Sequence, residues 1–364
     1  MGRNAKHIKT SAAISQPDQF STQSKLIMVR NVLLTVLLYT SWHLTSGNPL
    51  HQARWELIPD GNGFLRMVNI AAYSLPEDDS VQPLFNPHED IIYRLFTRSN
   101  PTEPQILTDA ESIHGSYFNP DHPTRFTIHG WSNDGSHFMN QEIRDEFLRV
   151  GDFNIITVDW GVGAMTNYIS ARANVGPAGA GVSGFLDRLL DATGISPDSI
   201  YLIGFSLGAH VAGNAGKGQR GLVNTIIALD PAGPLFSVGQ ETAVSPTDGQ
   251  YVETIMTNAG LLGINTVLGQ ANFFPNWGRT QPGCGTDTGG SCAHSRAPQF
   301  YAESISSSTA FRAVRCANHE EMLEGICTPS GDDANMGGQP SNQGRGVSGV
   351  FHLSTRAEAP FALG

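Results

Sequence analysis

Ser206 lies in the pentapeptide Gly-Phe-Ser-Leu-Gly of residues 204–208, a spacing that can present a serine as a nucleophile. An apolar strand pattern precedes the pentapeptide and a helical pattern follows it, which is the setting this motif requires. In so tight a turn, side chains at Gly204 and Gly208 would clash with the neighbouring strand and helix. The N–H of Leu207 would point at an oxyanion formed beside Ser206. The pattern predicts covalent catalysis at this serine; a glycine-rich loop with a capping serine is the alternative.

A nucleophilic serine also needs a general base and a carboxylate that orients the base. Asp230 follows the apolar stretch 225–229, and a carboxylate at the carboxyl end of a parallel strand lies on the functional edge of the sheet. We predict His294 as the base, on a loop pinned by a disulfide at Cys292. An Asp that forms a turn and an ordinary surface His are the alternatives. His210 is expected to be a packing or hydrogen-bonded residue.

A second donor to the oxyanion should come from the turn after an early strand. His129, Gly130 and Trp131 follow such a strand. Gly130 permits the turn, and the N–H of Trp131 would then face the same oxyanion hole as that of Leu207.

The elements that must position these residues alternate along the chain. Strand patterns occur at residues 91–97, 125–128, 154–158, 199–203, 225–229 and 350–353, and helical ones around residues 143–148, 182–190 and 207–215. Strands that are apolar throughout and separated by helices belong to a parallel sheet covered on both faces. We therefore predict one α/β domain after residue 48. Residues 48–90 are expected to be rich in loops, and residues 331–349 are expected to form a loop.

Composition and charge narrow the class of protein further. Of 364 residues, 40% are hydrophobic and 15% are charged, which is too apolar for a disordered chain. The chain carries 33 acidic against 22 basic residues, a net charge of −11. This acidity argues against nucleic acid, heparin or anionic lipid as an electrostatic partner.

Residues 1–47 have the pattern of a secretory signal. A basic flank ends at Arg30, an apolar run follows at 32–42, and small residues come after it. The run is short for a membrane span, which needs roughly 20 apolar residues. We expect a cleaved signal, with Met28 a candidate true start and residues 48–364 the secreted product. A retained anchor and an amphipathic organelle-targeting segment are the alternatives.

The four cysteines lie in the last quarter of the chain. They form no C-x-x-C pair, so a structural zinc site is not expected. Their spacing fits two local disulfides, Cys284–Cys292 and Cys316–Cys327, although four cysteines allow three connectivities. Disulfides would imply an oxidising compartment.

Five segments together carry a family resemblance, and they lie at residues 126–131, 204–210, 228–234, 272–276 and 292–296. In this order they resemble the animal pancreatic-type lipase family, particularly its insect and venom phospholipase A1 branch. The resemblance implies an α/β-hydrolase fold and a triad of Ser206, Asp230 and His294, with Trp131 and Leu207 as oxyanion donors. It implies hydrolysis of lipid esters at a lipid–water interface through an acyl-enzyme, with no cofactor.

Three departures from this family affect the expected substrate and partners. Only seven residues separate Cys284 from Cys292, where pancreatic lipases carry a long lid, and the stretch 259–271 is also short. In the family, short forms of both loops go with phospholipase A1 activity, so phospholipid is slightly favoured over triacylglycerol and galactolipid. Ser245 stands where the family's calcium loop has an Asp, which leaves Asp248 as a weak calcium candidate. We expect no C-terminal β-sandwich domain and no colipase docking.

A protein of another class remains as the rival hypothesis. Some insect relatives are catalytically idle, yolk-type lipid-binding or storage proteins on the same fold, and these typically lose the serine. Because Ser206, Asp230 and His294 are all present, the sequence favours the enzyme.

Overall fold

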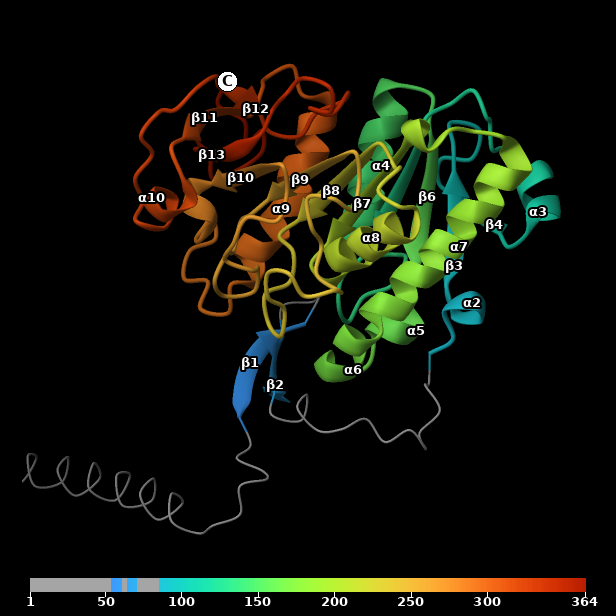
Figure 1. Cartoon of the computed structure of the whole chain (residues 1–364), viewed down its shortest axis with the longest axis horizontal. Helices are drawn as coiled ribbons and strands as arrows, with labels where there is room; N and C mark the ends of the chain where they lie inside the picture. The colour runs from blue at the N-terminus through green and yellow to red at the C-terminus, as the bar shows by residue number, and fades with distance from the viewer. Residues whose placement is uncertain (1–53, 61–63, 71–84) are drawn as a thin grey trace, which may run out of the picture. The chain divides into compact units, whose positions relative to one another are not determined.

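The computed structural model describes residues 54–60, 64–70 and 85–364. These residues form an eleven-stranded sheet with helices on both faces, together with a separate two-stranded hairpin (Figure 1). The predicted signal of residues 1–47, with its candidate start Met28, lies outside the described residues. Among the helices of the described ranges, none combines the length and the apolarity that crossing a bilayer requires.

The large sheet is parallel in its centre and antiparallel at both edges. Its strand order is β12 (Ala334–Asn335), β11 (Arg312–Cys316), β13 (Gly349–Leu353), β10 (Ala271–Pro275), β9 (Tyr251–Ile255), β8 (Thr225–Leu229), β7 (Ile200–Phe205), β5 (Thr124–Ile128), β6 (Asn154–Asp159), β3 (Ile92–Phe96) and β4 (Gln105–Leu107). Strands β5 to β10 are buried along their whole length, as expected for parallel strands covered on both faces.

Two layers of helices bury the two faces of the sheet (Figure 1). One layer contains α7 (Val175–Thr193) and α8 (Leu207–Gly218), and the other contains α4 (Phe138–Val150) and α9 (Ser291–Ser306). Shorter helices lie in the segments between these elements: α2 (Pro87–Asp90), α3 (Ala110–His114), α5 (Gly161–Ala164), α6 (Tyr168–Ala173), α10 (His319–Leu323) and the 3-10 turns η2 (Pro197–Ser199) and η3 (Asn276–Gly278).

Strand register brings the candidate residues to one edge. Ile128 of β5 pairs with Gly204 of β7, and Phe205 of β7 pairs with Leu229 of β8. The chain therefore leaves these three neighbouring strands at nearly the same level. The residues that follow the strands emerge together at the carboxyl edge of the sheet.

The predicted α/β class is correct, and each strand pattern quoted above corresponds to an observed strand. The sequence did not reveal two strands in the loop-rich region 48–90, and the loop expected at 331–349 contains the short strand β12. Strands β1 (Trp55–Pro59) and β2 (Leu65–Asn69) form an antiparallel hairpin in this region. The hairpin carries apolar residues on both faces, so the alternation that usually reveals a strand is missing from its sequence.

Both disulfides have the connectivity that the cysteine spacing suggested. Cys284 is bonded to Cys292 and Cys316 to Cys327. The first bond closes the short loop that leads into α9, and the second lies beside the edge strand β11.

Candidate active site

Ser206 is the single residue between the end of β7 and the start of α8. Its φ of 57° and ψ of −122° are a backbone conformation that residues with side chains rarely adopt. The N–H of Ser206 donates to the carbonyl of Leu229, and its own carbonyl accepts from Ala209 and Ala232. The strained turn is thus fixed by hydrogen bonds on both sides.

The glycines at either side of this turn have no room for a side chain. A Cβ at Gly204 would lie 2.1 Å from the carbonyl oxygen of Gly208. A Cβ at Gly208 would lie 2.2 Å from the carbonyl oxygen of Ile128. The close packing of β5, β7 and α8 therefore requires glycine at both positions.

Asp230 follows β8 and is completely buried. Its Oδ1 accepts from the N–H groups of Thr257, at 2.8 Å, and Asn258, at 3.0 Å. Its Oδ2 lies 2.5 Å from Nδ1 of His294. A proton on Nδ1 satisfies this contact and leaves Nε2 of the imidazole free to accept a proton. The sequence did not single out Thr257 and Asn258, because their role rests on backbone groups.

His294 lies in the first turn of α9, so the prediction of a loop was wrong. The carboxylate of Asp287 accepts hydrogen bonds from the N–H groups of Cys292 and Ala293, which satisfies the start of the helix. Pro298, inside α9, hides the helix from sequence reasoning because proline normally ends one. His294 is nevertheless held beside the disulfide, as expected.

Gly130 and Trp131 follow β5 and pass directly beside the serine. A Cβ at Gly130 would lie 2.9 Å from Cβ of Ser206. The Trp131 indole N–H donates to the carbonyl of Thr166, and its ring packs edge-on against Tyr168. Leu207 is the first residue of α8, where helix N–H groups have no partner within the helix.

These groups share one cleft, which is lined by Ile58, Asp60, Gly130, Trp131, Asn133, Tyr168, Phe205, Ser206, Ala232, Pro234, Leu262 and His294. The hairpin β1–β2 supplies the first two. The loop of residues 285–291, closed by the Cys284–Cys292 bond, supplies none.

Comparison with known proteins places this geometry in a family. A family model described as Lipase matches residues 76–361. The chain belongs to the lipase family. It is 33% identical over 298 residues to the pancreatic triacylglycerol lipase of Oryctolagus cuniculus, covering 74% of this chain and 64% of that protein. It is 35% identical over 246 residues to pancreatic lipase-related protein 2 of Cavia porcellus, covering 65% of this chain and 56% of that protein. The alignments thus span about three fifths of these relatives.

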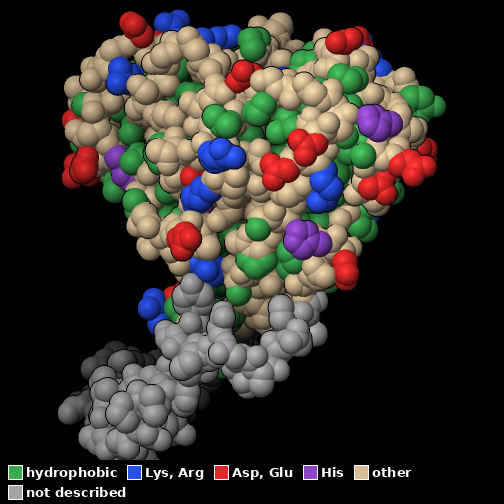
Figure 2. Space-filling model, turned by 45° about the vertical axis from the view of Figure 1, so that its right-hand side comes forward, with side chains coloured by type: hydrophobic (Ala, Val, Ile, Leu, Met, Phe, Trp, Pro, Cys, Tyr) green, Lys and Arg blue, Asp and Glu red, His purple; other side chains and the backbone are tan. Residues whose placement is uncertain are grey.

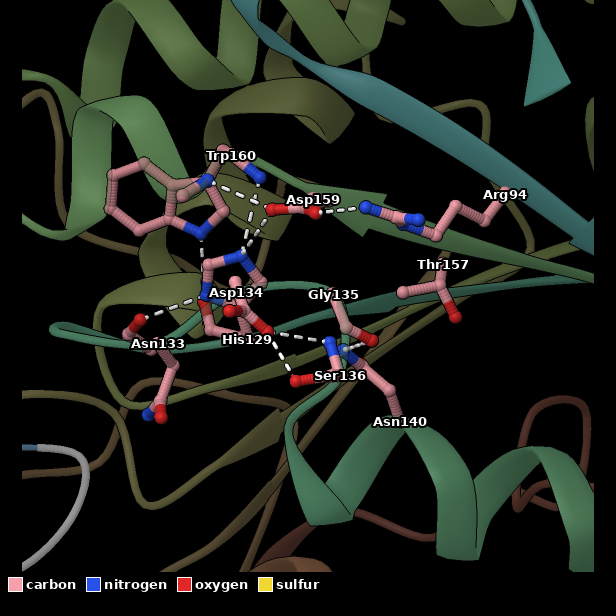
Figure 3. A network of polar contacts seen from close by, with 12 residues as sticks. Arg94, His129, Asn133, Asp134, Gly135, Ser136, Asn140, Thr157, Asp159 and Trp160 are labelled. Carbon is pink, nitrogen blue, oxygen red and sulfur yellow. Dashed lines mark hydrogen bonds and ion pairs between the residues drawn. The ribbon is translucent and has the colours of Figure 1, made fainter. Parts of the chain in front are cut away.

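A polar network that the sequence did not reveal supports the Gly130–Trp131 turn of this lipase-family chain. In Figure 3, Asp159, at the end of β6, lies between Arg94 and His129. The Arg94 guanidinium is 2.6 Å from Asp159 Oδ2, and His129 Nε2 is 3.6 Å from Oδ1. Burial alone would raise the pKa of Asp159, but the facing His129 and Arg94 hold that pKa well below its usual range.

His129 connects this network to the turn. Its Nδ1 lies 3.0 Å from the carbonyl oxygen of Gly130, and its Nε2 lies 3.2 Å from the N–H of Trp160. The indole N–H of Trp160 donates back to the carbonyl of His129. The backbone beside Ser206 is therefore held by side chains from β3 and β6.

Two other histidines near the cleft are structural. His210 is fully buried, donates from Nε2 to the carbonyl of Ala232 and accepts at Nδ1 from the N–H of Val244. His137 stacks on Phe205. Burial lowers the pKa of each to about 3, so both are neutral near pH 7.

The calcium candidate does not fit a metal. Ser245 donates to the Asp248 carboxylate through its N–H, at 2.8 Å, and through its hydroxyl, at 2.6 Å. The Lys217 ammonium lies 3.6 Å from Asp248 and donates to the carbonyls of Glu241 and Ala243, at 2.5 and 2.6 Å. A side-chain cation thus already binds the oxygens that a calcium ion would need.

One other cluster in the described residues has metal-like spacing. It comprises Cys284, Asp287 and Cys292. Both cysteines are in the disulfide, and metals bind cysteine as a thiolate. This cluster is therefore a structural staple for the start of α9.

Proposed function

We propose that this protein hydrolyses carboxylic esters of lipids by acyl transfer. The observation that carries the proposal is the 2.5 Å contact between Asp230 and His294, in a cleft that the strained Ser206 also lines. Ser206 Oγ attacks the ester carbonyl carbon while Nε2 of His294 takes its proton. Asp230 orients the imidazole and stabilises its charged form.

Two main-chain amides would stabilise the tetrahedral intermediate. The N–H groups of Trp131 and Leu207 donate to its oxyanion. His294 then passes its proton to the departing alcohol, which leaves an acyl group on Ser206. Water, activated by His294, attacks this acyl-enzyme and releases the fatty acid and the free serine.

The substrate we propose is a glycerolipid, with phospholipid cleaved in the manner of a phospholipase A1 as well as triacylglycerol. Matched relatives are named triacylglycerol lipase and pancreatic lipase-related protein 2. The short 285–291 loop lines no part of the cleft, and in the family short loops go with phospholipase A1 activity. Rates on triolein, sn-1-labelled phosphatidylcholine and a galactolipid would rank these substrates.

We also propose that the protein is secreted and works without a metal. Two disulfides and the apolar run at 32–42 support secretion. Expression of the full chain in cultured secretory cells should place the product in the medium, with a new N-terminus near residue 48. Lys217 supplies the positive charge that the family's calcium would bring to Asp248.

The decisive experiment asks whether Ser206 is a nucleophile. A fluorophosphonate probe should label the wild type and Ser330→Ala, an exposed serine that serves as the control, but not Ser206→Ala. Turnover of Ser206→Ala should fall by about 10⁶-fold. A wild-type protein that takes no label and hydrolyses no ester would instead support the idle lipid-binding alternative.

A further inference from the structure

The outward face of the hairpin β1–β2 is a continuous apolar surface. Directly paired residues of an antiparallel ribbon lie on the same face, and Leu57 pairs with Met67. Trp55 and Leu65 each lie two residues earlier in their strands, so they lie on that face too. The exposed fractions are 55% for Trp55, 57% for Leu57, 46% for Leu65 and 65% for Met67, and Phe64 at the turn is 65% exposed. We call these five side chains the hairpin face.

The opposite side of the hairpin is anchored. Ile58, Val68 and Ile70 are at most 8% exposed and belong to the hydrophobic core. The carboxylate of Asp60 accepts from the N–H of Phe64 and pairs with Arg66 at 2.8 Å. A two-stranded ribbon is marginal by itself, so these contacts fix it and leave the hairpin face turned to solvent.

The hairpin borders the cleft with the side that lies opposite to the hairpin face. Ile58 and Asp60, on the anchored side of the hairpin and at its turn, line the cleft beside Ser206 and His294. Leu261, next in the chain to the cleft-lining Leu262, is a further exposed apolar side chain.

The side of the molecule drawn in Figure 2 can be compared with the hairpin face. Figure 2 shows one side of the molecule on which hydrophobic side chains are scattered among charged and other groups. Soluble monomers rarely expose contiguous apolar patches unless the patch binds something. The charges of the hairpin are paired, Arg54 with Glu56 and Arg66 with Asp60, so this surface offers nothing to an anionic head group.

We propose that the hairpin face docks the protein on the surface of an aggregated, uncharged or zwitterionic lipid. Aromatic side chains such as Trp55 and Phe64 prefer the boundary between head groups and acyl chains. Insertion of the hairpin face would bring the hairpin, and with it the cleft that Ile58 and Asp60 line, to the lipid surface. A substrate molecule would then move from that lipid into the cleft. This inference rests on the proposed lipid-ester hydrolysis and names the surface that presents its substrate.

Binding to vesicles tests the docking without requiring turnover. Two full-length proteins are floated with phosphatidylcholine vesicles. One carries Ser206→Ala alone, and the other carries Ser206→Ala together with Leu57→Gln and Met67→Gln. The pair of substitutions should weaken partitioning at least tenfold, whereas Ile106→Gln with Val150→Gln, two exposed apolar residues elsewhere, should leave it within twofold. Partitioning should change little with added salt. Equal partitioning of all variants would overturn the proposal.

Activity separates this proposal from the proposed function. In the active protein, the Leu57→Gln and Met67→Gln pair should reduce kcat/KM on phosphatidylcholine vesicles at least tenfold. The kcat/KM on soluble p-nitrophenyl butyrate should stay within twofold, which also shows that the variant folds. The wild type could hydrolyse neither ester and still float with vesicles in a way that the paired substitutions weaken. In that case the docking proposal stands and the hydrolysis proposal fails. If the pair converts a dimer to a monomer without changing flotation, the face is a protein interface and docking is overturned.

Fluorescence can locate the contact itself. Vesicles of brominated phosphatidylcholine should quench part of the tryptophan emission of the Ser206→Ala protein. Trp55→Phe, which keeps the hairpin face apolar, should remove that quenched part without changing partitioning. Quenching that is the same with and without Trp55 would place the lipid contact elsewhere and overturn the proposal.

Discussion

Two walls of the cleft, the sheet edge and the hairpin, are held in different ways. At the sheet edge, hydrogen bonds fix the backbone of Ser206, and the Asp230 carboxylate contacts three N–H groups. The hairpin is held by a few apolar side chains and by Asp60 at its turn. Reacting groups need positions held within about 0.5 Å, whereas contact with a fluid lipid does not. The proposed chemistry and the proposed lipid contact therefore belong to differently built parts of the molecule.

The largest expected effect that separates these walls comes from Asp230→Asn. An amide at this position favours the wrong tautomer of His294, so kcat should fall by about 10⁴-fold. If the sheet edge serves only the chemistry, kcat should fall by the same factor on soluble p-nitrophenyl butyrate and on phosphatidylcholine vesicles. Initial rates on both substrates measure this. A loss confined to vesicles would show that the sheet edge also serves lipid contact.

Asp159→Asn should have an intermediate effect because Asp159 is a positioning residue. Without its charge the Arg94 contact weakens and the turn beside Ser206 loses support, so kcat should fall about tenfold with KM unchanged. Asp333→Asn, which breaks a more exposed pair with Arg312, is the matched control and should leave kcat unchanged. A rise in KM alone would argue against support of the oxyanion donors.

Lys217→Met should affect stability and leave catalysis at 25 °C unchanged. Asp248 loses its cation but keeps its two contacts with Ser245, so unfolding should become easier by about 1–2 kcal/mol. Thermal unfolding measures this loss, and Lys217→Arg should restore part of it. Wild-type Tm should be the same in calcium and in EDTA; a drop in EDTA would contradict the assignment of Lys217 as the cation.

Glu253 gives an effect that is spread over several pH units, a dependence of stability on pH at a residue remote from both walls. Burial raises the pKa of Glu253 from 4.5 to about 7, against the hydrogen bonds from Asn342 and Gly337. Between pH 4.5 and pH 7, the Glu253 carboxyl has lost its proton in the unfolded chain but keeps it in the folded chain. Stability should therefore fall by about 1.4 kcal/mol per pH unit as pH rises from 4.5 to 7.

Chemical denaturation at several pH values checks this slope. The Gln of Glu253→Gln has no proton to lose. The free energy of unfolding of this variant should therefore lack the pH dependence that Glu253 causes, even if its value differs from that of the wild type. Glu358→Gln, at an exposed position, should keep the wild-type slope. Identical slopes in all three proteins would show that folding does not raise the pKa of Glu253.

The predictable parts of the molecule are those with local signals. Strands β5 to β8 are continuous apolar runs, and the glycines around Ser206 follow from the space available in one turn. The sequence did not reveal the hairpin, because packing against distant parts of the core stabilises it. It did not reveal the start of α9, because the Asp287 carboxylate and the Cys284–Cys292 disulfide hold that end of the helix. The Arg94–Asp159 pair joins residues 65 positions apart, and no local pattern reveals such a contact.

The position of β13 has a consequence for how the chain is made. This strand lies between β10 and β11, although both precede it in the sequence. During synthesis β10 keeps a bare edge, and β11 with β12 has nothing to join, until residues 349–353 leave the ribosome. A premature stop between His294 and this strand would therefore yield a product prone to aggregate, even though every candidate catalytic residue had already been translated.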